Sequence, residues 1–133
     1  MFLLLLVLTI TIINAESKQI PSEIKKTWHD LTDKHEKVCL DESKTKSEYI
    51  KMMVEEAQVT NDKSFGCYLN CVFRKLGIIM TDGEFDVKSI LSKASYMTPE
   101  LTNKCVDESK KDSDACQKSL TAANCTVSGL SVN

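Results

Sequence analysis

Six cysteines are the residues of this sequence with the clearest chemistry, because two thiols can be oxidised to a disulfide. An even count in a chain of 133 residues suits three disulfides with no thiol left over. Cys67 and Cys71 lie four residues apart on a predicted helix. Their Cβ atoms would stand about 5–6 Å apart, whereas a disulfide needs about 3.5–4.5 Å. Each must therefore pair with a different element, and the choice among the remaining pairings stays open.

Other chemistry has few residues to support it. The two histidines, His29 and His35, lie in no Cys/His ligand pattern, so we expect no zinc site, and we expect no other cofactor. His29 and Asp30 are the nearest candidates for a catalytic pair, but adjacent residues of a helix point in different directions. The sequence contains neither a nucleophile elbow nor a calcium-loop motif. We therefore predict that the protein is not an enzyme.

An apolar run, FLLLLVLTITII, occupies residues 2–13, and the first charged residue is Glu16. The run is shorter than the about 20 residues that cross a bilayer, so we interpret residues 1–15 as a cleaved signal peptide and residues 16–133 as the mature domain. Secretion agrees with the cysteine count, because disulfides persist in oxidising compartments. The formal charge of −2 includes no basic block, so we expect neither nucleic-acid binding nor membrane insertion.

The elements that position the cysteines are predicted to be helices. Apolar residues recur every three or four positions through most of the mature chain, and four glycines and two prolines are few for a turn-rich β-sandwich. We therefore predict one all-α domain of about six helices. They are expected over residues 22–39, from residue 45, over residues 62–76 and 86–96, from residue 98 and from residue 113.

Local signals refine these helices. Thr45 and Glu48 form a capping-box pattern, and Thr98, Pro99 and Glu100 combine an N-cap residue, a proline suited to the first turn and an acid near the positive helix end. The inward stripe of the first helix is predicted to be Ile24, Trp28, Leu31, His35 and Val38. The next two helices are expected to bury Ile50, Met53, Val54, Ala57, Phe65, Tyr68, Leu69, Val72 and Phe73.

The spacing of the cysteines resembles that of a known family. The six cysteines are separated in turn by 27, three, 33, ten and eight residues. This pattern, above all its gaps of three and eight, resembles the six-cysteine pattern of insect odorant-binding proteins, and the match extends over the whole mature chain. The resemblance implies a compact bundle of about six helices around an apolar cavity, with the disulfides Cys39–Cys71, Cys67–Cys116 and Cys105–Cys125.

For function, the resemblance implies a secreted carrier that binds a small apolar volatile or lipid-like molecule, such as an odorant or pheromone, and delivers it to a membrane receptor. In the family the fourth to sixth helices bound the cavity, and Tyr68 or Tyr96 is expected to orient a polar group. Residues 126–133 are few for the pocket-entering tail of some members. The predicted ligand contacts are Met53, Leu76, Ile90, Leu91, Ala94, Tyr96, Met97, Leu101, Leu120, Ala123 and Val127.

Two other functions would use similar features. A secreted lipid hydrolase would need a positioned base, which the two neighbouring histidines do not supply. A non-olfactory carrier, or a gland or venom protein that acts by protein contact, would keep the same scaffold. A chemically inert protein that still binds apolar probes would exclude the hydrolase. The tissue of expression separates odour transport from the second alternative, because antennal expression supports the former and glandular expression the latter.

Overall fold

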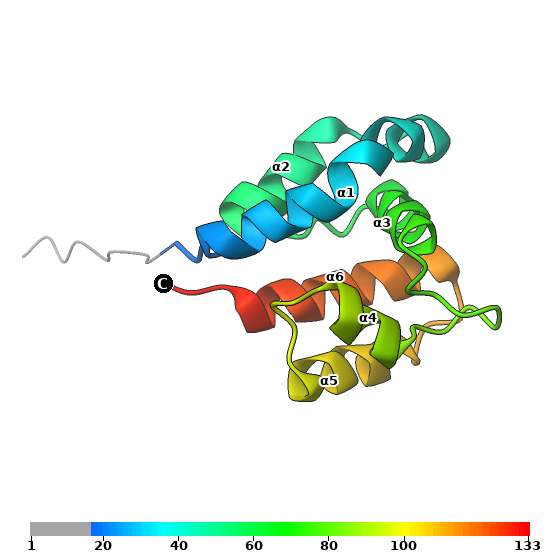
Figure 1. Cartoon of the computed structure of the whole chain (residues 1–133). Coiled ribbons are helices and arrows are strands. Elements are labelled where there is room, and N and C mark those ends of the chain that lie inside the picture. Colours follow the sequence, from blue (N-terminus) through cyan, green and yellow to red (C-terminus); the bar gives the residue numbers. More distant parts are fainter. Residues whose placement is uncertain (1–16) are drawn as a thin grey trace, which may run out of the picture.

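The computed structural model describes residues 17–133, which form six α-helices joined by short loops (Figure 1). The helices are α1 (Ser22–Ser43), α2 (Ser47–Glu56), α3 (Lys63–Lys75), α4 (Val87–Lys93), α5 (Pro99–Ser109) and α6 (Ala115–Leu130). This confirms the predicted all-α class. The signal peptide predicted over residues 1–15 lies outside the described residues. Of the helices between residues 17 and 133, none has the length and apolar character to cross a membrane.

The helices form two layers that α3 connects. Figure 1 shows α1 and α2 on one side and α4, α5 and α6 on the other. α3 packs against both α1 and α6, and α5 packs against α4 and α6. The central role of α3 follows from its sequence, because its apolar residues Phe65, Tyr68, Leu69, Val72 and Phe73 are all buried.

Three disulfides fasten this arrangement, and no cysteine is free. Cys39–Cys71 joins α1 to α3, Cys67–Cys116 joins α3 to α6, and Cys105–Cys125 joins α5 to α6. These are the pairs that the family resemblance implies. As the helix geometry required, Cys67 and Cys71 reach different partners. Four of the six helices are therefore linked covalently into one frame.

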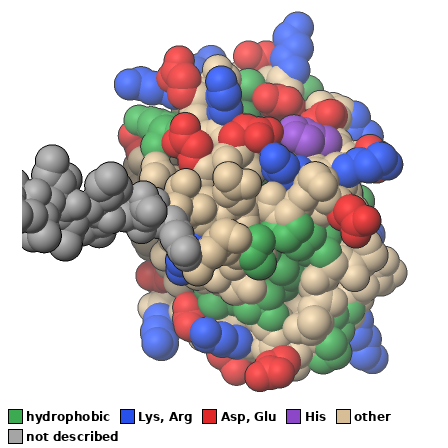
Figure 2. Space-filling view, turned by 90° about the vertical axis from the view of Figure 1, so that its left-hand side faces the viewer, with side chains coloured by type: hydrophobic (Ala, Val, Ile, Leu, Met, Phe, Trp, Pro, Cys, Tyr) green, Lys and Arg blue, Asp and Glu red, His purple; other side chains and the backbone are tan. Residues whose placement is uncertain are grey.

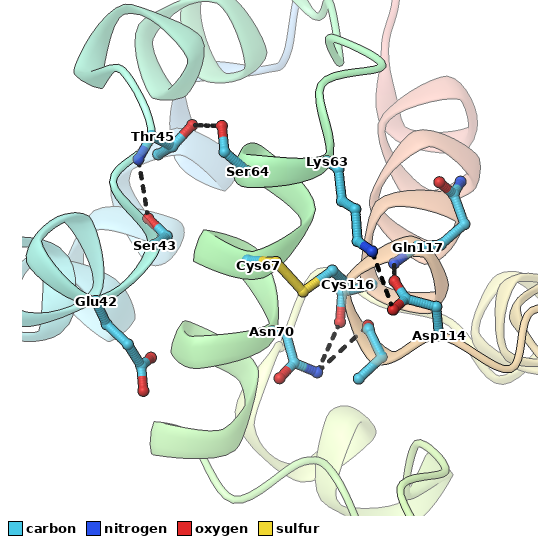
Figure 3. Close-up of a disulfide and its surroundings, with 12 residues drawn as sticks. Glu42, Ser43, Thr45, Lys63, Ser64, Cys67, Asn70, Asp114, Cys116 and Gln117 are labelled. Carbon is cyan, nitrogen blue, oxygen red and sulfur yellow. Dashed lines mark hydrogen bonds and ion pairs between the residues drawn. A yellow bond between two sulfur atoms is a disulfide. The ribbon is translucent and has the colours of Figure 1, made fainter.

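The contact between α3 and α6 is unusually close around the Cys67–Cys116 disulfide (Figure 3). A Cβ atom at Gly66 would lie 2.3 Å from the carbonyl oxygen of Cys116, so only glycine fits there. The side-chain amide of Asn70 donates to the Ala115 carbonyl at 3.4 Å and to the Ser119 hydroxyl at 3.2 Å. Covalent, steric and polar features thus fix the same contact.

Aspartates cap three of the helices. Asp62, Asp86 and Asp114 precede α3, α4 and α6, and each accepts a backbone N–H of the first turn. Hydrogen bonds lower the pKa of each carboxyl, mainly from the Ser64 and Ser89 side chains for Asp62 and Asp86 and from the Gln117 backbone for Asp114. These caps therefore stabilise the fold above the ordinary aspartate pKa and are lost as the pH falls through the lowered values.

The predicted capping box at Thr45 is wrong. α2 begins two residues later, after Lys46, and has no side-chain cap. The hydroxyls of Thr45 and Ser64 instead form a hydrogen bond of 2.8 Å with each other, which connects the segment before α2 to α3 (Figure 3). A tertiary hydrogen bond has therefore taken the group that the local pattern assigned to a cap. By contrast, the predicted start of α5 is confirmed, because the Thr98 hydroxyl accepts the backbone N–H of Leu101.

The first helix differs from its prediction in length and in its inward face. α1 continues to Ser43 and ends where Lys44 adopts a left-handed conformation. Val38, predicted on the inward stripe, is 53 % exposed, whereas Thr32 and Cys39 are buried. The disulfide to α3 explains this difference, because it turns the Cys39 side of the helix inward and the adjacent Val38 outward.

A buried lysine, which the sequence analysis did not single out, joins a loop to two helices. Lys118 on α6 is 8 % exposed, and its ammonium lies 2.8 Å from Oε1 of Glu84 and 3.3 Å from the Ser109 carbonyl. These contacts hold the loop before α4 against α5 and α6. Phe85, the next residue of that loop, is buried.

We expect Lys118→Met to lower the free energy of unfolding by about 1–2 kcal/mol. Breaking a fully buried ion pair costs about 3–5 kcal/mol, and we expect a smaller effect here because the Glu84 side chain as a whole is 32 % exposed, although its Oε2 atom is buried. Denaturant unfolding measures the change. Lys26→Met is the matched control, because it removes the exposed Lys26–Asp30 pair and should change stability by less than about 0.5 kcal/mol. Equal effects of the two substitutions would contradict the prediction.

Candidate ligand-binding pocket

A cavity of about 130 Å³ lies between the two layers of helices. Its floor consists of side chains from α3, α5, α6 and the loop before α4, each at most 9 % exposed: Leu69, Phe73, Ile78, Phe85, Val106 and Ala122. An engineered cavity of about 150 Å³ holds one benzene molecule, so the enclosed space suits a body of about one ring. A cavity with this apolar lining favours apolar ligands.

Half-buried residues mark the side on which the pocket opens. They belong to the first half of α1, the loop between α4 and α5, and the end of α6: Ile24, Trp28, Leu31, Tyr96, Met97, Thr126, Val127 and Leu130. These three segments meet on one side of the molecule in Figure 1. Figure 2 shows that side, on which apolar side chains form a patch with charged side chains around it. An apolar molecule can therefore approach the cavity over apolar surface.

The end of α4 determines much of this rim. The helix was predicted to reach residue 96 but ends at Lys93, and Ala94 leaves the helical conformation. A turn follows, closed by a hydrogen bond from the Met97 N–H to the Ala94 carbonyl at 2.9 Å. This turn brings Ala94, Tyr96 and Met97 together at the pocket.

The structure places most of the eleven predicted ligand contacts around this one cavity. Eight of them border it: Met53, Leu76, Ile90, Ala94, Tyr96, Met97, Ala123 and Val127. They come from α2, from the residue after α3, from α4 and the turn after it, and from α6. The pocket therefore draws on segments far apart in the sequence, which only the folded chain brings together.

Leu91, Leu101 and Leu120 lie elsewhere. Leu120 is buried in the contact between α6 and α3, where it faces Gly66. Leu101 packs over Gly129 at the end of α6. Leu91 is half-buried on α4, next to the pocket residue Ile90 but not on the lining. An apolar stripe on a helix is wider than the part that reaches the cavity, so neighbouring residues pack against other helices instead.

Sequence reasoning missed one whole wall of the pocket. Ile24, Trp28 and Leu31 were predicted to face inward but were not assigned to the cavity, which they border. Their helical spacing was a usable signal. Phe73 and Phe85 also border the cavity and contact each other edge to face, with ring centroids 5.6 Å apart. Thr102 borders it as well, and no pattern in the sequence indicates this.

The two tyrosines proposed to orient a ligand lie in different places. Tyr96 borders the pocket, and burial raises the pKa of its phenol to about 12, so it stays protonated at neutral pH. Tyr68 lies outside the lining, where its ring stacks on Phe65 with centroids 5.9 Å apart. Burial, followed by the negative charges of Glu36 and Asp33, raises the pKa of Tyr68 well above its ordinary value.

Two lysines among the lining residues are already engaged. Lys25 pairs with Glu55 at 3.1 Å, which links α1 to α2, and the Lys93 ammonium donates to the Leu76 carbonyl at the end of α3. His29 is outside the pocket and contacts Asp33, not Asp30, at 3.0 Å. Within residues 17–133, no three His, Cys, Asp or Glu residues form a group that could hold a metal ion. The described site is thus suited to binding an apolar molecule.

Comparison with known proteins agrees with this geometry. The sequence model of the PBP/GOBP family matches residues 21–128. The chain is 27 % identical over 111 residues to general odorant-binding protein 99b of Drosophila melanogaster, covering 77 % of this chain and 73 % of that protein. Its structure is similar to the crystal structure of the medfly odorant-binding protein CcapOBP22/CcapOBP69a, with a TM-score of 0.51, 20 % identity, and coverage of 72 % of this chain and 84 % of that one.

The family match spans most of the chain, from the residue before α1 almost to the end of α6. It includes all six cysteines and every residue that borders the cavity except Ile20 and Leu130. By this match the chain belongs to the PBP/GOBP family, the insect odorant-binding proteins.

Proposed function

We propose that this protein is a secreted carrier that binds a small hydrophobic molecule, such as an odorant or pheromone, in the pocket and transports it through extracellular fluid. The observation that carries the proposal is the cavity itself, which buried apolar side chains enclose in a bundle held by three disulfides. The apolar run of residues 2–13 supports secretion, and delivery to a membrane receptor is the step that release would serve.

The energetics suit a reversible carrier. Burying about 300 Å² of apolar ligand surface at about 25 cal/mol/Å² contributes about 7 kcal/mol, which corresponds to micromolar affinity before ordering costs. Such binding retains the ligand in solution and still permits release. Such binding depends only on the removal of apolar ligand surface from water and requires no catalytic residue.

Filling the cavity tests the proposal. In oxidised protein, Ala123→Phe is expected to weaken binding of a fluorescent apolar probe at least tenfold, because Ala123 is buried on the α6 face that borders the pocket. Ala115→Phe is the matched control, since Ala115 is exposed on the same helix outside the pocket. Circular dichroism checks that both variants fold. If wild-type protein binds no probe, or if both variants bind it equally, the carrier proposal fails.

A further inference from the structure

One hydroxyl group at the pocket has no hydrogen-bond partner in the described part of the protein. Thr102 on α5 is 1 % exposed and borders the cavity, and its Oγ1 is buried and unpaired. Glu84 Oε2 is the other unpaired buried side-chain atom within residues 17–133, but the second oxygen of that carboxylate binds Lys118. Thr102 is therefore a whole polar side chain buried without a partner.

Other hydroxyls on the helices do not share this condition. Thr27, Thr32 and Ser109 each donate to a backbone carbonyl three or four residues earlier, at 2.7–3.1 Å. The equivalent acceptor for Thr102 is the Thr98 carbonyl, which receives the Thr102 backbone N–H at 3.0 Å but not its hydroxyl. A buried polar group without a hydrogen bond costs about 1–3 kcal/mol, and a valine would fill the same space without that cost.

The missing partner can come from the pocket. The lining residues next to Thr102 on the same helix, Cys105 and Val106, have no side-chain N–H or O–H group to offer, and no other side chain within residues 17–133 bonds the Thr102 hydroxyl. Thr102 itself borders the cavity, and a threonine in a helix populates two χ1 settings, so its hydroxyl can reorient without movement of α5. A bound molecule that places an oxygen there would satisfy it.

The surroundings also define what kind of oxygen fits. The Thr102 hydroxyl both donates and accepts, so an alcohol, a carbonyl or an ester oxygen would match it. A carboxylate would bring a charge to a buried apolar floor, and the lining cations Lys25 and Lys93 already have partners. A hydrocarbon would leave the hydroxyl unpaired.

We propose that Thr102 determines the specificity of this pocket by binding one neutral oxygen of an otherwise apolar ligand, so that neutral oxygenated molecules bind better than hydrocarbons of the same shape and better than carboxylates. This inference rests on the proposed carrier function and goes beyond it, because a carrier without the Thr102 contact would bind by shape alone.

Competition against a fluorescent apolar probe tests the proposal with three compounds that differ at one position. These are para-ethylphenol, para-ethyltoluene and para-ethylbenzoic acid at neutral pH. Wild-type protein is expected to bind the phenol about three- to tenfold more tightly than the hydrocarbon, the range that one hydrogen bond supplies, and the carboxylate most weakly. Thr102→Val is expected to abolish the preference for the phenol while keeping the affinity for the hydrocarbon.

Two further variants make the result specific. Thr102→Ser keeps a hydroxyl and should retain the preference, and Thr126→Val removes the half-buried hydroxyl of another lining residue and should retain it too. Binding of the hydrocarbon tests the carrier function separately. If the hydrocarbon binds but the phenol has no advantage in wild type, or keeps its advantage in Thr102→Val, the role of Thr102 is refuted and the carrier function stands. If none of the three compounds displaces a bound probe, the role of Thr102 is refuted, and if wild-type protein binds no probe, both proposals fail.

Discussion

Replacing both cysteines of one disulfide, as Cys105→Ala/Cys125→Ala, is expected to lower the free energy of unfolding by about 3 kcal/mol and to weaken probe binding as well. The stability loss follows from the entropy that the unfolded chain regains when a loop with a sequence separation of 20 is opened. The binding loss follows from position, because Cys105 borders the cavity and the bridge holds α5, which carries Thr102 and Val106, against α6. Urea unfolding and probe titration measure the two effects.

The disulfide between α1 and α3 supplies the matched control. Cys39 and Cys71 are fully buried, and neither borders the cavity. We expect Cys39→Ala/Cys71→Ala to destabilise the protein to a similar extent. The loop that this disulfide closes is longer, with a sequence separation of 32, but the entropy of closing a loop grows only with the logarithm of its length. At a temperature where both variants are folded, it should bind the probe more tightly than Cys105→Ala/Cys125→Ala. Equal affinities would mean that the α5–α6 bridge has no particular role in shaping the pocket.

These bridges also explain why so small a domain tolerates a hollow centre. Unfilled apolar volume removes packing contacts, and the penalty grows with the volume of the cavity. A single domain of this size has a total stability of about 5–15 kcal/mol, and each disulfide contributes about 3–4 kcal/mol in the chain-entropy model. Covalent links therefore replace part of the stabilisation that a solid core would give, and the space between the two layers is left for a ligand.

The cysteine pattern and helical periodicity were enough to predict the architecture. Helix geometry alone separated Cys67 from Cys71, and the inward face of α3 was predicted residue by residue. These features depend on residues close together in the sequence. The Thr45 cap failed for the opposite reason, because its hydroxyl binds Ser64, which is remote in the chain.

Membership of the pocket was harder to predict than the elements themselves. Leu120 and Ala123 lie on the same buried side of α6, but Leu120 faces α3 at Gly66 and Ala123 faces the cavity. The difference depends on the direction from which α3 crosses α6, and a helical stripe contains no such information. Thr102 could not be predicted for a similar reason. Only the structure shows that its hydroxyl is buried and has no hydrogen-bond partner within residues 17–133.

Gly66 is the residue at which that crossing is most sensitive to a single added atom. We expect Gly66→Ala to lower the free energy of unfolding by about 2 kcal/mol or more, although alanine favours a helix over glycine by about 1 kcal/mol. The new Cβ would lie 2.3 Å from the Cys116 carbonyl oxygen. This backbone atom cannot move aside, because the adjacent disulfide holds the Cα atoms of Cys67 and Cys116 only 4.3 Å apart. Urea unfolding of oxidised protein measures the loss.

Gly129→Ala is the control for this substitution, since it adds the same methyl group to a helix at a second tight contact. There the nearest atom is the tip of the Leu101 side chain at 2.4 Å, which can rotate away, so the gain in helix propensity should offset most of the strain. We expect the free energy of unfolding of Gly129→Ala to differ from that of wild type by less than about 1 kcal/mol. Disulfide mapping of this variant should find Cys67 and Cys116 paired as in wild type. If the two variants have the same free energy of unfolding, α3 and α6 can move apart at Gly66 without a loss of stability. The close contact between these helices would then not be what positions the buried residues of the pocket.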